Sequence, residues 1–212
     1  MARTDLCELL SKILCWFGDV LWFLRNALRK RPPLTTEQQK CLLYLLHQVL
    51  LDLQVLAYRG KGEEADMLAD IFHNLPRDLC EEKPRWPLYL SAPIQRTFWR
   101  TTDYPSRVRI IKRQKLSFYP AIAMNSPKMP TGQYRALLNL LHNLLTEIRN
   151  RSSQEELEPV EALAKVFQNL PLQMLMGKID WSFYFEALSN LQNRHTLYGD
   201  FADLLRSAQQ NL

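Results

Sequence analysis

The sequence predicts an all-α protein in which internally duplicated helical-hairpin units pack as a pseudo-twofold bundle, with an N-terminal helix and a basic, partly irregular insert. Residues 36–76 and 131–171 align without a gap and agree at fifteen of 41 positions, more than leucine-rich composition alone would give. Apolar residues recur within both segments at helical spacing. Both segments close on a proline, Pro76 and Pro171, which disfavours helix at the preceding residue.

The repeat divides the chain into four parts. We expect an amphipathic N-terminal helix in residues 1–35, a first helical repeat in 36–95, a basic insert in 96–130, and a second repeat with C-terminal helices in 131–212. The positions of the first copy that recur unchanged in the second are Thr36, Gln38, Leu42, Leu43, Leu45, Leu46, His47, Leu50, Glu63, Leu68, Ala69, Phe72, Asn74, Leu75 and Pro76. Most of them are apolar, so the repeat preserves the part of each unit that packs.

Residues 4–31 form an apolar, aromatic segment with the chemistry of a helix. Acidic residues come early in it, basic residues come late, and Pro32 and Pro33 follow. Charged residues interrupt it throughout, whereas a membrane span needs about twenty consecutive apolar residues. The basic residues follow the apolar stretch, which is the wrong order for a signal peptide. We expect a packing helix; the alternatives are an interfacial membrane helix and a helix that docks on a partner.

Each repeat predicts a hairpin of two antiparallel helices. The first helix begins at Thr36, where Gln39 would complete a capping box, and at Thr131 in the second copy. The second helix begins near Glu63 or Glu158, because an acidic side chain is favoured at a helix N-terminus. The apolar faces of the two helices would meet.

The sequence beyond the hairpins is less alike. In the second copy, 149–156 is polar and is expected to connect the two helices, and Asp180 is expected to cap a further helix. In the first copy, Pro87 and Pro93 break or kink the equivalent of that further helix.

The cysteine content indicates a reducing compartment. The four cysteines form no CxxC pair and no dense framework, and Cys41 and Cys80 fall opposite Ala136 and Leu175 in the second copy. A position that accepts these residues behaves as a small apolar site. We expect reduced thiols and a cytoplasmic protein.

Histidines recur in the repeats at His47 and His142. Each has leucines three and four residues away, and we expect a histidine hydrogen-bonded within the hairpin core, for instance to Asn74 or Asn169. Those asparagines are otherwise expected to be helix C-terminal caps. The sequence contains no glycine-rich phosphate loop, no HExxH, no nucleophile elbow and no zinc-type Cys/His spacing. We therefore expect no cofactor and no metal.

One catalytic pattern is present on the second copy. Arg135 and His142 give an Arg-x6-His spacing that resembles the signature of HEPN ribonucleases, which are all-α proteins. The resemblance implies RNA cleavage by Arg135 and His142. The first copy departs from the pattern, because Lys40 replaces the arginine, and Ala136 stands where that family usually has a polar residue.

The insert carries most of the basic charge. Residues 96–130 contain eight lysines and arginines against one aspartate, whereas 36–95 and 131–212 are each mildly acidic. Arginines with interleaved aromatic residues are suited to phosphates and bases, or to an acidic protein surface. A solvated loop, or one that docks on its own repeats, is the simpler interpretation. The candidate binding residues are Arg96, Trp99, Arg100, Tyr104, Arg107, Arg109, Lys112, Arg113 and Lys115.

The motifs LLxLLHxxL, LAxxFxNLP and the tryptophan after them resemble a group of small uncharacterised bacterial all-α proteins with an "LADxFHNLP" motif. The resemblance covers about 36–90 and 131–190, and it implies a bacterial origin and a helical bundle. We expect a non-catalytic interaction protein, such as an inhibitor, immunity-type factor or adaptor, that binds a macromolecular partner through the insert. Nucleic-acid binding by 96–115 is the first alternative and the ribonuclease is the second. A protein partner is favoured over nucleic acid, and a membrane is not expected.

Overall fold

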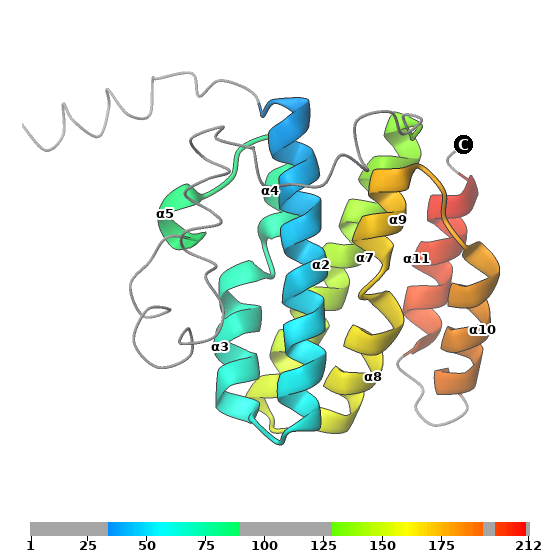
Figure 1. The fold of residues 1–212 in the computed structure, drawn as a ribbon. Coiled ribbons are helices and arrows are strands. Elements are labelled where there is room, and N and C mark those ends of the chain that lie inside the picture. Colours follow the sequence, from blue (N-terminus) through cyan, green and yellow to red (C-terminus); the bar gives the residue numbers. More distant parts are fainter. Residues whose placement is uncertain (1–33, 90–128, 193–197, 211–212) are drawn as a thin grey trace, which may run out of the picture. The chain divides into compact units, whose positions relative to one another are not determined.

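The computed structural model describes residues 34–89, 129–192 and 198–210, and the regular structure in these ranges is all helical (Figure 1). The predicted all-α class is confirmed. The described residues belong to one compact unit of the chain, Leu34–Leu212. The helix expected in 4–31 and nearly all of the insert expected in 96–130 lie outside the described residues.

The helices follow one another in the same order in the two repeats. The first repeat contains α2 (Thr36–Tyr58), α3 (Gly62–Phe72), α4 (Leu75–Cys80) and α5 (Trp86–Tyr89). The second contains α7 (Thr131–Ser153), α8 (Leu157–Phe167), α9 (Leu170–Met176) and α10 (Trp181–Gln192), and α11 (Tyr198–Gln210) follows. The helices α7, α8, α9 and α10 begin 95 residues after α2, α3, α4 and α5 respectively, which is the spacing of the sequence repeat.

The two long helices α2 and α7 form the centre of the core. Leucines spaced four residues apart, such as Leu42 and Leu46 in α2 and Leu137 and Leu141 in α7, are fully buried. Burying each of these side chains stabilises the fold by about 1.5–3 kcal/mol before the cost of ordering it. Within the described part of the chain, α2 is the helix long and apolar enough to cross a membrane. Because 61% of its apolar window is buried inside the fold, its hydrophobicity is accounted for by core packing.

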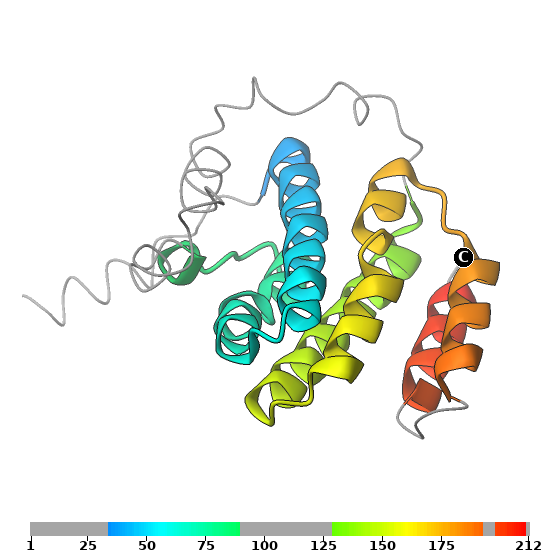
Figure 2. The same cartoon turned by 60° about the horizontal axis from the view of Figure 1, so that its bottom comes forward.

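Each long helix packs mainly on the short helices of the other repeat. The helix α2 packs on α8 and α9, and α7 packs on α3 and α4. Figures 1 and 2 show α2 and α8 side by side, although 98 residues separate them in the sequence. The helix α11 packs on α7 and on α10, and so extends the second repeat on its outer side (Figure 1).

The N-caps of the two long helices differ from the predicted ones. The N-cap of α2 is Thr35 rather than Thr36, and its capping box is completed by Gln38: the Gln38 N–H donates to Thr35 Oγ1 at 3.2 Å, and the Thr35 N–H donates to Gln38 Oε1 at 3.0 Å. The N-cap of α7 is Pro130, with no side-chain hydrogen bond, so the predicted Thr131 cap is wrong. The cap predicted for α10 is confirmed, because Asp180 Oδ1 accepts the Phe183 N–H at 3.2 Å.

The connections differ from prediction at two places. The helix α7 continues to Ser153, so the polar stretch 149–156 is mostly helix and the connection is only three residues long. The asparagines Asn74 and Asn169 are not C-caps; they precede α4 and α9, which carry Pro76 and Pro171 in their first turns. Proline is tolerated there because its missing N–H would have no partner in the first turn. Each proline therefore ends one helix and helps to begin the next.

Two turns in each repeat use a left-handed residue. The positive φ angles belong to Gly60 (70°) and Glu82 (54°) in the first repeat and to Glu155 (60°) and Gly177 (64°) in the second. Gly60 is the counterpart of Glu155, and Glu82 is the counterpart of Gly177. At every one of these positions the next residue donates a backbone hydrogen bond to the carbonyl five residues before it, as in a Schellman motif. Each repeat thus places glycine at one left-handed turn and glutamate at the other.

Glu155→Gly is expected to raise the free energy of unfolding by about 0.5–1 kcal/mol, because glycine adopts this conformation without the strain that a Cβ causes. The matched Gly60→Glu is expected to lower it by a similar amount. Nothing lies within 4 Å of a Cβ built on Gly60, so backbone strain alone would act. Denaturant unfolding of both variants checks this, with Gln154→Gly as control, since Gln154 has an ordinary φ of −95°. A stabilising Gly60→Glu would contradict the expectation.

Candidate functional site

The predicted partner-binding residues, all within 96–115, lie outside the described residues, so their arrangement is not part of the described structure. The structure does describe the residues on either side of the segment 90–128. These are the end of α5 at Tyr89 and the residue Met129 before α7.

The buried carboxylate of Asp78 fixes the end of α5 at Tyr89. Asp78 of α4 accepts a hydrogen bond from the Tyr89 hydroxyl at 2.6 Å and two from Arg85, through its backbone N–H at 2.9 Å and its Nε at 3.2 Å. Tyr89 is fully buried and stacks on Phe72, with 5.6 Å between the ring centroids. Burial, and then the hydrogen bond to Asp78, raise the pKa of Tyr89, so its hydroxyl stays a donor at neutral pH. The chain is therefore fixed to the core at Tyr89.

The second repeat keeps the stacking but not the carboxylate. Tyr184 stacks on Phe167 at 5.5 Å, yet Gln173 stands in the place of Asp78 and accepts the Asp180 N–H at 2.9 Å. The Tyr184 hydroxyl is buried and has no hydrogen-bond partner among the described residues. The Asp78 network is thus a feature of the repeat that precedes the insert.

The second position is held by apolar packing. Met129 is half-buried and packs against the hydrophobic core just before α7 begins. Both ends of the segment 90–128 therefore start from ordered structure.

The repeated histidines link the two repeats reciprocally. His47 Nδ1 lies 2.6 Å from the carbonyl oxygen of Gln168, and His142 Nδ1 lies 2.8 Å from the carbonyl oxygen of His73. A carbonyl can only accept, so Nδ1 carries the hydrogen in both rings. The predicted hydrogen bond within a single hairpin, to Asn74 or Asn169, is wrong. The partner of each histidine is the backbone at the end of α8 or α3 of the other repeat.

The structure does not gather Arg135 and His142 around one cavity. Arg135 is exposed near the start of α7 and lines a pocket, whereas His142 is half-buried, two turns further on, with its Nδ1 bonded to His73. His142 does not line that pocket. The ribonuclease alternative stays a prediction, which an RNA-cleavage assay of the protein and its His142→Ala variant tests.

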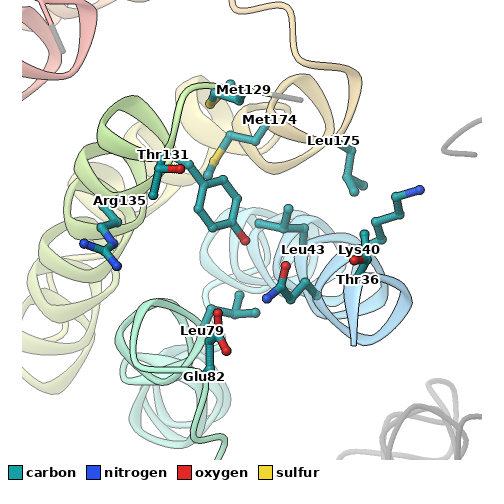
Figure 3. A pocket seen from close by; sticks show the side chains of 12 residues that line it. Thr36, Lys40, Leu43, Leu79, Glu82, Met129, Thr131, Arg135, Met174 and Leu175 are labelled. Atoms are coloured by element: carbon teal, nitrogen blue, oxygen red, sulfur yellow. The ribbon is translucent and has the colours of Figure 1, made fainter. Parts of the chain in front are cut away.

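A pocket of about 340 Å³ lies between the N-terminal ends of α2 and α7 (Figure 3). It is lined in addition by residues from the ends of α4 and α9. Several lining residues are counterparts in the repeat: Thr36 and Thr131, Gln39 and Tyr134, Lys40 and Arg135, and Leu79 and Met174. The pocket is therefore formed by equivalent parts of the two repeats.

Sequence reasoning did not find this pocket. The sequence did contain one sign of it. Equivalent positions of the two repeats carry a basic residue, Lys40 and Arg135, four residues after the repeated threonines Thr36 and Thr131. We interpreted that pair only as a departure from the ribonuclease pattern. Which helix ends meet in the fold is a tertiary property that the sequence repeat does not state.

The described residues contain no group of three or more His, Cys, Asp or Glu side chains that could hold a metal ion. Cys41 and Cys80 are free thiols, and burial raises the pKa of Cys41 to about 12, which favours the protonated thiol at neutral pH. No protein-family model, curated protein or solved structure matches the chain.

Proposed function

We propose that the protein is a non-catalytic interaction protein, of the inhibitor, immunity-factor or adaptor kind, that binds an acidic macromolecular partner through residues 96–115. The observation that carries the proposal is the charge distribution. Residues 96–130 hold eight basic residues against one acidic residue, and each repeat holds more acidic than basic residues. A concentrated basic segment steers and retains an acidic partner.

The fold around the segment supports this role. Tyr89 and Met129, which flank residues 90–128, are both held in the helical unit, Tyr89 by the Asp78 network and Met129 by packing against the core. A binding segment tied at both ends loses less conformational entropy on binding than a free tail would lose. The repeats then act as the scaffold and the segment between them acts as the binding element.

We also propose that the scaffold arose by internal duplication and packs with a pseudo-twofold arrangement. The common 95-residue spacing of the helix starts supports this, as do the reciprocal histidine contacts and the paired left-handed turns. A cytoplasmic location belongs to the same proposal, and the buried state of most of α2 is compatible with it.

The binding proposal is tested with the full chain and labelled polyglutamate as a model acidic polypeptide. We expect saturable binding that weakens as salt is raised, and a loss of roughly tenfold or more in affinity when Arg107, Arg109, Lys112 and Arg113 are changed to glutamine. A matched control changes four exposed basic residues of the described helices and turns to glutamine: Arg77, Lys165, Lys178 and Arg206. Equal losses in the two quadruple variants would mean that net charge, rather than the segment, determines binding.

Nucleic acid is the second candidate, because Trp99 and Tyr104 lie among the arginines of the segment. Aromatic stacking contributes about 1–3 kcal/mol per base in single-strand binding. The same titration with single-stranded RNA distinguishes the two partners. RNA binding that exceeds polyglutamate binding at equal salt, and that drops in a Trp99→Ala variant, would favour nucleic acid over an acidic protein.

A further inference from the structure

The pocket between α2 and α7 has an apolar interior. Leu43, Leu79 and Met174 are almost completely buried, and half-buried Met129 and Leu175 complete the apolar lining. Figure 3 shows Met129 and Met174 along one edge and Leu79 along the opposite edge, with Leu43 between them. A volume of about 340 Å³ is at the lower end of the range for small-molecule sites, roughly 300–1,000 Å³.

The rim of the pocket is polar and carries more positive than negative charge. Lys40 and Arg135 lie on opposite sides, and Glu82 is the acidic side chain in the lining (Figure 3). Lys40 already pairs with Glu37, with 3.5 Å between Nζ and Oε1. Arg135 makes no hydrogen bond or ion pair with any other described residue. An anion bound beside Arg135 would therefore displace none of the described residues from it.

Two further groups in the pocket lining can donate hydrogen bonds. The Tyr134 hydroxyl oxygen is buried and has no partner in the described part of the chain, although buried hydroxyls are normally satisfied. Burial, with smaller contributions from Cys80 and Glu82, raises the pKa of Tyr134 to about 12, so the hydroxyl keeps its proton. The start of α7 has no side-chain cap, which leaves first-turn N–H groups near Thr131 without an intrahelical partner.

We propose that this pocket binds a small amphipathic anion, an unbranched aliphatic carboxylate, with its chain against the apolar interior and its carboxylate beside Arg135 and Tyr134. The carboxylate would compensate the charge of Arg135 and accept the hydrogen bond that Tyr134 otherwise lacks. The aliphatic chain would cover the methionine and leucine side chains of the interior. This site is separate from the basic segment 96–115 and does not depend on the function proposed for it.

The test is calorimetric titration of the full chain with octanoate and decanoate, with acetate and decanol as matched probes. We expect one binding site and tighter binding of decanoate than of octanoate. Acetate lacks the aliphatic chain and decanol lacks the carboxylate, so each is expected to bind at least roughly tenfold more weakly than decanoate. Arg135→Gln is expected to weaken decanoate binding roughly tenfold or more, because it removes a charge-assisted hydrogen bond.

Three further variants make the test specific. Glu82→Gln is expected to tighten decanoate binding, because it removes the negative charge on the rim. Tyr134→Phe is expected to weaken it, and Lys165→Gln, an exposed charge on α8 outside the pocket, is expected to leave it unchanged. The fold of each variant is checked by thermal unfolding.

Two results would overturn the proposed carboxylate site, and a third concerns its independence from the basic segment. Absence of saturable decanoate binding by the full chain would overturn the proposal, and would mean that the pocket is empty or covered by another part of the chain. Equal weakening by Arg135→Gln and Lys165→Gln would also overturn it, since binding would then follow net charge. Decanoate binding that survives neutralisation of Arg107, Arg109, Lys112 and Arg113 would confirm that the pocket and the basic segment are independent.

Discussion

Replacing Phe72 by alanine is expected to lower the free energy of unfolding by about 3–5 kcal/mol, the largest effect of a single change in the first repeat. Phe72 is fully buried at the end of α3, and its ring lies parallel to that of Tyr89, with an interplanar angle of 5°. Removing the ring leaves a cavity and exposes the face of Tyr89 that the stack covers. Tyr89 is the last described residue before the segment 90–128, so the same change removes a contact of the helical unit directly before that segment.

Chemical denaturation measures this effect, and the repeat provides a matched variant. Phe167→Ala removes the equivalent ring, which stacks on Tyr184 at an angle of 9°, and it is expected to cost a similar amount. Phe183→Ala is the control, since that side chain is 44% exposed and should change the stability by much less. A Phe72→Ala variant no less stable than the Phe183→Ala variant would contradict the assignment of Phe72 to the core.

Asp78→Ala is expected to lower the free energy of unfolding by about 2–4 kcal/mol, because it leaves the buried Tyr89 hydroxyl without its acceptor and removes both contacts to Arg85. Asp78→Asn is expected to cost less, since the amide oxygen can still accept one of these hydrogen bonds. Gln173→Ala, the same change at the equivalent position, is expected to cost about 1 kcal/mol or less, since Gln173 accepts one exposed hydrogen bond.

Denaturant titration of the three variants gives these differences directly. The double variant Asp78→Ala with Tyr89→Phe is the control for the mechanism, because it removes donor and acceptor together. It should be less destabilised than the sum of the single changes. If Asp78→Ala and Gln173→Ala lowered the free energy of unfolding equally, the Asp78 carboxylate would add no stability to the first repeat.

The sequence was sufficient to locate α2, α3, α7 and α8 and much of the core, but not the short helices α4 and α9, which begin where the prolines were expected to end each hairpin. The leucines from Leu42 to Leu50 and from Leu137 to Leu145 were expected on one face, and they are buried. Helical periodicity identifies the face of a helix that is buried, but it does not identify the element that covers that face. For the same reason the periodicity could not show that α2 is covered by α8 of the other repeat.

The predictions were wrong where the local sequence allowed two alternative caps, or where a side chain bonds to a residue far away in the sequence. Thr35 and Thr36 are both followed by a glutamine three residues later, so either could begin a capping box, and the structure uses Thr35 with Gln38. His47 was expected to bond within its own hairpin, but its partner is the backbone of Gln168, which no property of the neighbouring sequence identifies.

The pocket escaped prediction for a related reason. Lys40 and Arg135 are equivalent in the repeat, but only the crossed packing of α2 on α8 and α7 on α3 brings the ends of α2 and α7 to one cavity. A sequence repeat shows which residues are equivalent. It does not show which equivalent residues meet.

The two repeats form one scaffold, because each long helix packs on the short helices of the other repeat. The most direct measurement is fragment complementation with residues 1–95 and 129–212, followed by circular dichroism and denaturant unfolding. We predict that neither fragment alone unfolds cooperatively, and that an equimolar mixture regains helical content and a single cooperative transition. Two fragments that each fold alone, with stabilities that mixing does not change, would contradict the account.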